Sequence, residues 1–143
     1  MSGVVLATFG VGVVGGLVPF VNVEAWVIGV SAACPGASAV PVAVAAALGQ
    51  VTAKAVLYRA GEAALRARDR GARLEGALRR LAAGPGRSRA LVFASALTGV
   101  PPFALVSVAA GAVRFPFASF VTLALVGRLL RFAAVFALAR VGR

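Results

Sequence analysis

The sequence contains no histidine, a single cysteine and only four acidic residues. The lack of histidine removes the commonest general base and the commonest zinc ligand. Cys34 has no second cysteine to pair with, so the sequence excludes an internal disulfide and a cysteine-based metal cluster. Because so few acids remain for acid–base chemistry, we expect no enzymatic activity, no cofactor and no bound metal.

Basic residues are plentiful, but most of them lie in one segment. Fifteen lysines and arginines give a net charge of +11, and nine arginines lie between Arg59 and Arg89 beside three acids. This distribution is typical of a cytoplasmic loop that follows the positive-inside rule. A basic loop between membrane spans faces anionic headgroups. We therefore expect membrane lipids as partners and no binding of nucleic acid.

Apolar residues make up 61% of the 143 residues, whereas soluble domains are about half apolar. A soluble core of this size has no room for so much apolar surface. We therefore predict one all-α integral membrane domain over residues 1–143. Residues 37–58 and 116–138 are each long enough to cross a bilayer core, which needs about 20 helical residues.

The remaining segments are less regular. Residues 3–20 form a marginal span, and residues 90–113 are interrupted by two adjacent prolines. In the basic loop, Leu74, Leu78 and Leu81 recur at helical spacing. This spacing predicts an amphipathic helix on the inner leaflet that joins the two halves of the chain.

Two similar motifs divide the sequence into halves. "GLVPF" (16–20) and "GVPPF" (99–103) superpose without a gap, and Gly49 and Gly127 follow in the two downstream spans. This correspondence predicts an inverted repeat. The predicted parts are a first repeat, a basic loop and a second repeat, at residues 1–58, 59–89 and 90–143.

In transporters, helices interrupted by glycine or proline often occur at corresponding positions in the two halves of the chain, and they mark the binding site. Here each interrupted segment is followed by a full span. Irregular backbone at membrane depth persists only where protein or a water-filled cavity satisfies its polar groups. The alternative is that the prolines only kink continuous spans, which gives four spans and a cytoplasmic C-terminus. We predict two re-entrant hairpins instead, with tip residues Gly16, Pro19, Asn22, Gly99, Pro101, Pro102 and Ser107.

Four charged residues inside apolar sequence are the candidate site residues. Glu24 follows the first tip, and a carboxylate within a membrane is a candidate for taking up and releasing a proton. Arg128 lies deep in the last span with Arg131 three residues further on, and guanidinium groups bind phosphate through paired hydrogen bonds. Lys54 is a third candidate for binding a lipid phosphate, although snorkelling to the headgroups explains it equally well. A structural ion pair between Glu24 and Arg128 is the other interpretation.

The second half of the chain, "SALTGVPPFALVSVAAGAVRFPFASFVTLALVGRLLRF" (95–132), resembles the DedA family, also called the VTT or SNARE-associated domain. In the first half, "PFVNVE" (19–24) and "GQVTAKAVLYRAG" (49–61) are similar to the corresponding parts of that family. The second tip lacks the arginines of larger members and resembles the short YqaA-like branch. The motifs that carry the resemblance are Pro101-Pro102, Ala110-Gly111, Arg114-Phe115-Pro116, Phe120 and Gly127-Arg128.

The resemblance implies two opposed re-entrant hairpins with crossing helices. It also implies movement of lipids such as undecaprenyl phosphate between leaflets, with proton coupling in some members. We expect a multi-pass transporter or flippase for a lipid phosphate, or a protein of lipid homeostasis, in the inner or plasma membrane. A homo-oligomer is compatible with the sequence. The alternatives are a non-transporting scaffold that binds anionic lipid or a partner through its basic loop, and a small-solute or drug exporter.

Overall fold

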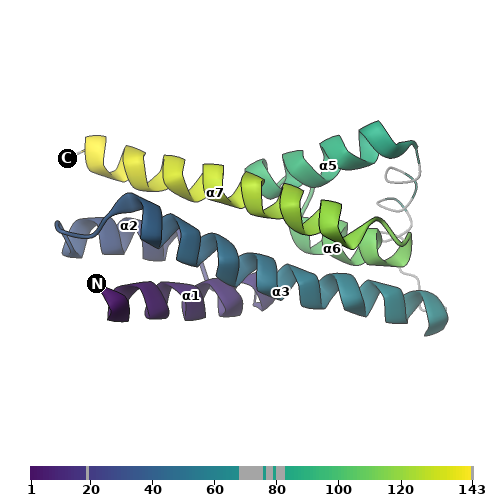
Figure 1. Ribbon diagram of the computed structural model, residues 1–143, viewed down its shortest axis with the longest axis horizontal. Coiled ribbons are helices and arrows are strands. Elements are labelled where there is room, and N and C mark those ends of the chain that lie inside the picture. Colours follow the sequence, from purple (N-terminus) through teal and green to yellow (C-terminus); the bar gives the residue numbers. More distant parts are fainter. Residues whose placement is uncertain (19, 68–75, 77–78, 80–82, 143) are drawn as a thin grey trace. The chain divides into compact units, whose positions relative to one another are not determined.

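The computed structural model describes residues 1–18, 20–67, 76, 79 and 83–142. This part of the chain is helical and contains no strand, which confirms the all-α prediction. Two short helices followed by one long helix occur twice along the chain (Figure 1). The amphipathic helix predicted around Leu74 to Leu81 lies largely outside the described residues. The helices are α1 (Ser2–Leu17), α2 (Val23–Ala33), α3 (Ala39–Ala67), α5 (Pro85–Thr98), α6 (Phe103–Ala112) and α7 (Phe117–Val141).

Both proline motifs interrupt the helices completely. Helix α1 ends at Leu17, and helix α5 ends at Thr98, where Gly99 takes the left-handed conformation with φ 81°. Glycine is the usual residue at such a helix end because it has no Cβ. The two prolines after Gly99 cannot continue a helix. The interpretation of these motifs as kinks in continuous helices is therefore wrong.

Two helices in the described part of the chain are long and apolar enough to cross a membrane, namely residues 39–63 of α3 and the whole of α7. The sequence predicted these two spans, but with different limits. Helix α3 continues past Tyr58 to Ala67 because this stretch contains mostly alanine, arginine, glutamate and leucine, which favour helix. Helix α5 begins at Pro85 instead of residue 90, because proline is well suited to a first helical turn.

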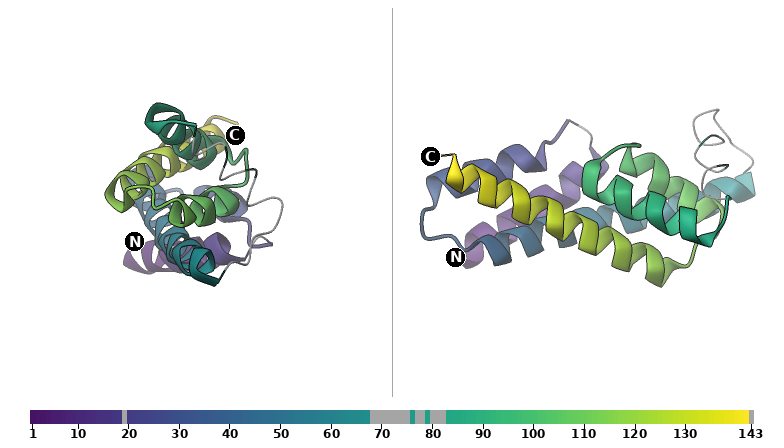
Figure 2. Two further views of the ribbon diagram at one scale, coloured as in Figure 1. Left: turned by 90° about the vertical axis from the view of Figure 1, so that its right-hand side faces the viewer. Right: turned by 90° about the horizontal axis from the view of Figure 1, so that it is seen from above.

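The chain divides into two compact units, which we describe separately. The first contains Met1–Ala53 and Arg128–Arg143, and the second contains Lys54–Gly127. In both, the two short helices pack as a pair, α1 with α2 and α5 with α6 (Figure 1 and Figure 2).

Small residues bring α1 and α3 together in the first unit. A Cβ added at Gly12 would lie 2.8 Å from the carbonyl oxygen of Ala46, and one added at Gly16 would collide with Ala53. Gly49 on α3 packs equally closely against Gly12. Gly12 and Gly16 form a GxxxG pair, which lets helix backbones approach closely within a membrane.

Close backbone packing also holds α3 and α6 together in the second unit. Gly111 packs against the backbone of Tyr58, and Gly61 packs against that of Val108, with no room for a Cβ at either glycine. An aromatic cluster fills the space beside them, in which the ring of Phe120 lies 5.1 Å from that of Tyr58. Gly127 on α7 contacts Ala96 on α5 in the same unit.

We predict that Gly12→Leu and Gly49→Leu lower the thermal stability of the purified protein in detergent. The added side chains have no space, and overpacking typically costs about 1–3 kcal/mol. Gly10→Leu is the matched control, because nothing lies within 4 Å of a Cβ at that position of α1. An equal loss of stability in all three variants contradicts the packing described here.

Candidate functional site

The candidate site is built around the first turn of α2. Asn22 precedes this helix, and its side-chain oxygen accepts a hydrogen bond of 3.1 Å from the backbone N–H of Ala25. This cap fixes where α2 starts. Glu24 therefore lies in the first turn, where the helix dipole favours a negative charge.

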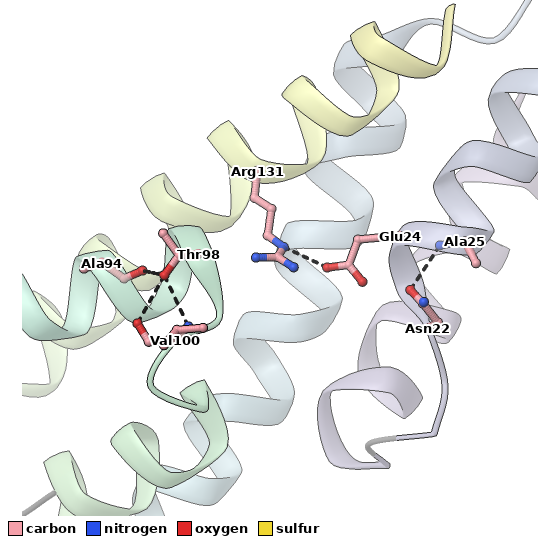
Figure 3. Close-up of polar contacts among 7 residues, drawn as sticks. All are labelled: Asn22, Glu24, Ala25, Ala94, Thr98, Val100 and Arg131. Atoms are coloured by element: carbon pink, nitrogen blue, oxygen red, sulfur yellow. Dashed lines mark hydrogen bonds and ion pairs between the residues drawn. The ribbon is translucent and has the colours of Figure 1, made fainter. Parts of the chain in front are cut away.

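Glu24 forms an ion pair with Arg131 of α7 (Figure 3). The Nε of Arg131 donates a hydrogen bond of 2.7 Å to Oε1 of Glu24. Both residues belong to the first unit although 107 positions separate them in the sequence. The two side chains are 26% and 30% exposed, so the pair is neither deeply buried nor fully open.

Arg128 lies one turn before Arg131 on the same helix and is only 7% exposed. Its charge interacts electrostatically with both Arg131 and Glu24. The structure thus brings three of the four predicted charged residues into one cluster of two guanidinium groups and one carboxylate. With all three ionised, the cluster has a net charge of +1, which attracts an anion.

Lys54 is the fourth predicted residue, and it lies on α3 in the second unit. It is 6% exposed and makes an interaction within the protein. In the snorkelling interpretation, the ammonium group of Lys54 extends outward to the headgroups. The burial of Lys54 does not favour that interpretation.

The predicted tip residues fall into different environments. Gly16 lies in the last turn of α1 and packs against α3, so it contributes to helix packing. Ser107 lies within α6, where its buried hydroxyl donates to the carbonyl oxygen of Phe103 at 2.6 Å. Asn22 and Gly99 lie in the connections themselves, and Pro19 is outside the described residues.

Side chains satisfy exposed backbone groups at the second connection. The hydroxyl of Thr98 donates to the carbonyl oxygen of Ala94 at 2.7 Å and accepts a hydrogen bond from the N–H of Val100 at 3.2 Å (Figure 3). The hydroxyl of Ser95 donates to the carbonyl oxygen of Pro101. These bonds give polar backbone groups at the second connection partners within the protein.

One contact that positions the site was not anticipated from the sequence. The indole N–H of Trp26 on α2 donates to the hydroxyl of Thr8 on α1 at 3.0 Å. This bond ties the two short helices together at a residue two positions after Glu24. A lone tryptophan in an apolar helix signals that its N–H needs a partner, but the sequence does not say which residue supplies it.

Comparisons with models of protein families, with curated proteins and with solved structures found no match to this chain.

We predict that the ion pair stabilises the fold cooperatively. Glu24→Gln and Arg131→Gln should each lower the unfolding temperature, because each leaves one charge without its partner. The double variant should lose less than the sum of the two, with a coupling of about 0.5–3 kcal/mol. Thermal unfolding of the four proteins in detergent measures this coupling, and strictly additive losses contradict the pair.

Proposed function

We propose that this chain is a DedA-like membrane transporter that moves a lipid phosphate between leaflets, with two re-entrant hairpins arranged as an inverted repeat. The observation that carries the proposal is the cluster of Glu24, Arg131 and Arg128. Ionisable residues in apolar, membrane-length helices are rare because they are costly, and they mark substrate and proton pathways.

Helix lengths support re-entry of the short helices. Helix α2 has 11 residues and α6 has 10, so each is about 15–17 Å long at 1.5 Å per residue. The hydrocarbon core is about 30 Å thick. A hairpin built from these helices reaches about halfway across the membrane and returns to the side from which it entered.

The side chains at the two connections also fit a lipid environment. Phe20 in the first connection is 93% exposed, and Val100 in the second is 75% exposed. A loop in water usually carries polar residues at its most exposed positions. Apolar side chains at both connections favour tips that end in lipid.

Matching contacts in the two units support the repeat. The ungapped alignment of the two motifs places residues 12–13 on 95–96, and Gly49 corresponds to Gly127 when a gap of five residues is allowed. Gly49 packs against Phe9, Gly12 and Val13, while Gly127 packs against Ala96 and Leu97. Each of these two glycines thus packs against the first helix of the hairpin in its own repeat, which supports the proposed repeat.

In each repeat, a turn joins the second short helix to the long helix. A side chain from the long helix of the other repeat donates hydrogen bonds to this turn. In the first unit, Arg140 of α7 donates to the carbonyl oxygens of Pro35 and Ala37 in the turn before α3, at 3.0 and 2.7 Å. In the second unit, the hydroxyl of Tyr58 on α3 donates to the carbonyl oxygen of Phe115 in the turn before α7. This reciprocity is what an inverted repeat produces.

The mechanism follows from competition for Arg131. When Glu24 is ionised, its carboxylate is paired with the guanidinium group of Arg131. Protonation of Glu24 removes that negative charge, and Arg131 and Arg128 then hold the phosphate of a lipid headgroup through charge-assisted hydrogen bonds. Loss of the proton restores the ion pair and releases the phosphate, so lipid binding and proton uptake are coupled.

We predict that Glu24→Ala and Arg128→Ala each slow leaflet exchange of a fluorescent lipid phosphate in proteoliposomes by about tenfold or more. For Arg128→Ala the estimate reflects loss of one charge-assisted contact to the phosphate of about 1.5–3 kcal/mol. Glu24→Ala leaves no carboxylate to displace the phosphate from Arg131, so release of the lipid is slowed. Arg87→Ala, which removes an exposed arginine in the first turn of α5, should keep the wild-type rate.

The exchanged pair Glu24→Arg with Arg131→Glu separates a structural role from transport. The exchange keeps one ion pair between the same positions and should largely restore thermal stability. Transport should remain lost, because the proton-accepting carboxylate and the phosphate-binding arginine have changed places. Wild-type exchange rates in this variant, or in both alanine variants, overturn the mechanism.

A further inference from the structure

A polar cavity lies at the ends of the two candidate spans, in the second unit. It has a volume of about 330 Å³ and is lined by the C-terminal part of α3 and the turn between α6 and α7. The span in α3 extends to residue 63 and the span in α7 begins at Phe117, so this cavity lies where both spans leave the apolar core. In the membrane topology proposed above, that depth corresponds to lipid headgroups, where tyrosine is also enriched. The lining residues are Tyr58, Glu62, Arg114, Phe115, Pro116 and Phe117.

The backbone at Arg114 is the first indication that its side chain has a role. Arg114 has φ 55°, the only positive φ at a residue other than glycine in the described part of the chain. The N–H of Phe115 bonds to the carbonyl oxygen of Ala110, and that of Arg114 bonds to Gly111, which is the Schellman pattern of a helix end. Glycine is the usual residue at this position because a side chain there is strained. An arginine at such a position points to a function for its guanidinium group.

The cavity carries charges of both signs. Arg114 supplies a guanidinium group, and Glu62 supplies a carboxylate that is 31% exposed in its side chain. Glu62 is also paired with Arg59 through Oε2 at 3.0 Å, and the guanidinium group of Arg59 lies 4.7 Å from the ring centroid of Phe117, which lines the cavity. An anionic headgroup alone would meet repulsion from Glu62, whereas a headgroup with both charges matches both residues.

We infer that this cavity binds the phosphoethanolamine headgroup of a zwitterionic membrane lipid. The phosphate accepts hydrogen bonds from Arg114, and the primary ammonium donates to the carboxylate of Glu62. Binding at this site is independent of the transport proposed above, because it uses no residue of the Glu24 cluster. Its chemical signature is a requirement for N–H donors on the headgroup, since Glu62 can only accept hydrogen bonds when ionised.

The test measures lipid binding to the full chain in detergent by native mass spectrometry. The probes are phosphatidylethanolamine, its N-methyl and N,N-dimethyl derivatives, phosphatidylcholine and phosphatidylglycerol, all with the same acyl chains. Affinity should fall stepwise as methyl groups replace N–H donors, to about tenfold weaker for phosphatidylcholine. Phosphatidylglycerol should also bind more weakly than phosphatidylethanolamine.

Two variants that break the same ion pair isolate the carboxylate. Glu62→Gln removes the pair and the negative charge in the cavity, so it should abolish the preference for phosphatidylethanolamine. Arg59→Gln removes the pair but keeps the carboxylate, so the preference should remain.

Arg114→Gly removes the guanidinium group while suiting the left-handed backbone, and it should weaken the binding of all the phospholipids without loss of folding. Arg114→Lys keeps the charge and should preserve binding.

Three results overturn the inference. The first is equal affinity for phosphatidylethanolamine and phosphatidylcholine in the wild-type chain. The second is an identical lipid preference in Glu62→Gln and Arg59→Gln. The third is binding of free glycerophosphoethanolamine as tightly as the lipid, which assigns the cavity to a soluble ligand.

Discussion

An arginine within an apolar helix of membrane length needs a partner, and the pair of Arg131 with Glu24 meets this requirement in the first unit. The carboxylate has a defined position because several weaker interactions locate it. Asn22 caps α2 immediately before Glu24, and the bond between Trp26 and Thr8 ties α2 to α1. Helix α1 in turn packs on α3 through glycines that admit no side chain. The glycines on α1 and α3, the bond between Trp26 and Thr8, and the Asn22 cap therefore together position Glu24 for its ion pair. The proposed exchange, in which a phosphate replaces the carboxylate at Arg131, depends on these contacts.

Much of the helical framework was predictable because local chemistry determines it. Adjacent prolines and a glycine end α5 whatever surrounds them, and long uncharged runs mark α3 and α7 as candidate spans. The partners of individual side chains were not predictable. Glu24 and Arg131 are 107 positions apart, and nothing local distinguishes Arg131 from Arg128 as the partner. The limits of α3 were also misplaced, since the basic segment that was predicted to be a loop begins with good helix formers.

The tail of the chain illustrates how one contact changes the interpretation of a charge. Two hairpins place the C-terminus on the opposite side from the basic loop, which conflicts with the positive-inside rule if Arg140 is counted as a topology signal. Arg140, however, donates to two carbonyl oxygens in the turn before α3, and its guanidinium group lies over the ring of Phe136. A charge with such partners serves to close a turn. The contacts of Arg140 therefore give it a structural role, and its charge alone does not decide between the two topologies.

The central claim is that both short-helix pairs enter the membrane and return on the same side. Single cysteines at Ser2, Gly36, Arg87 and Arg114, in a Cys34→Ala background, test it with a thiol reagent that does not cross membranes. Re-entrant hairpins place positions 2 and 36 together on one side and positions 87 and 114 together on the other. A four-span topology instead separates the two members of each pair, so opposite labelling of positions 2 and 36 would contradict the account.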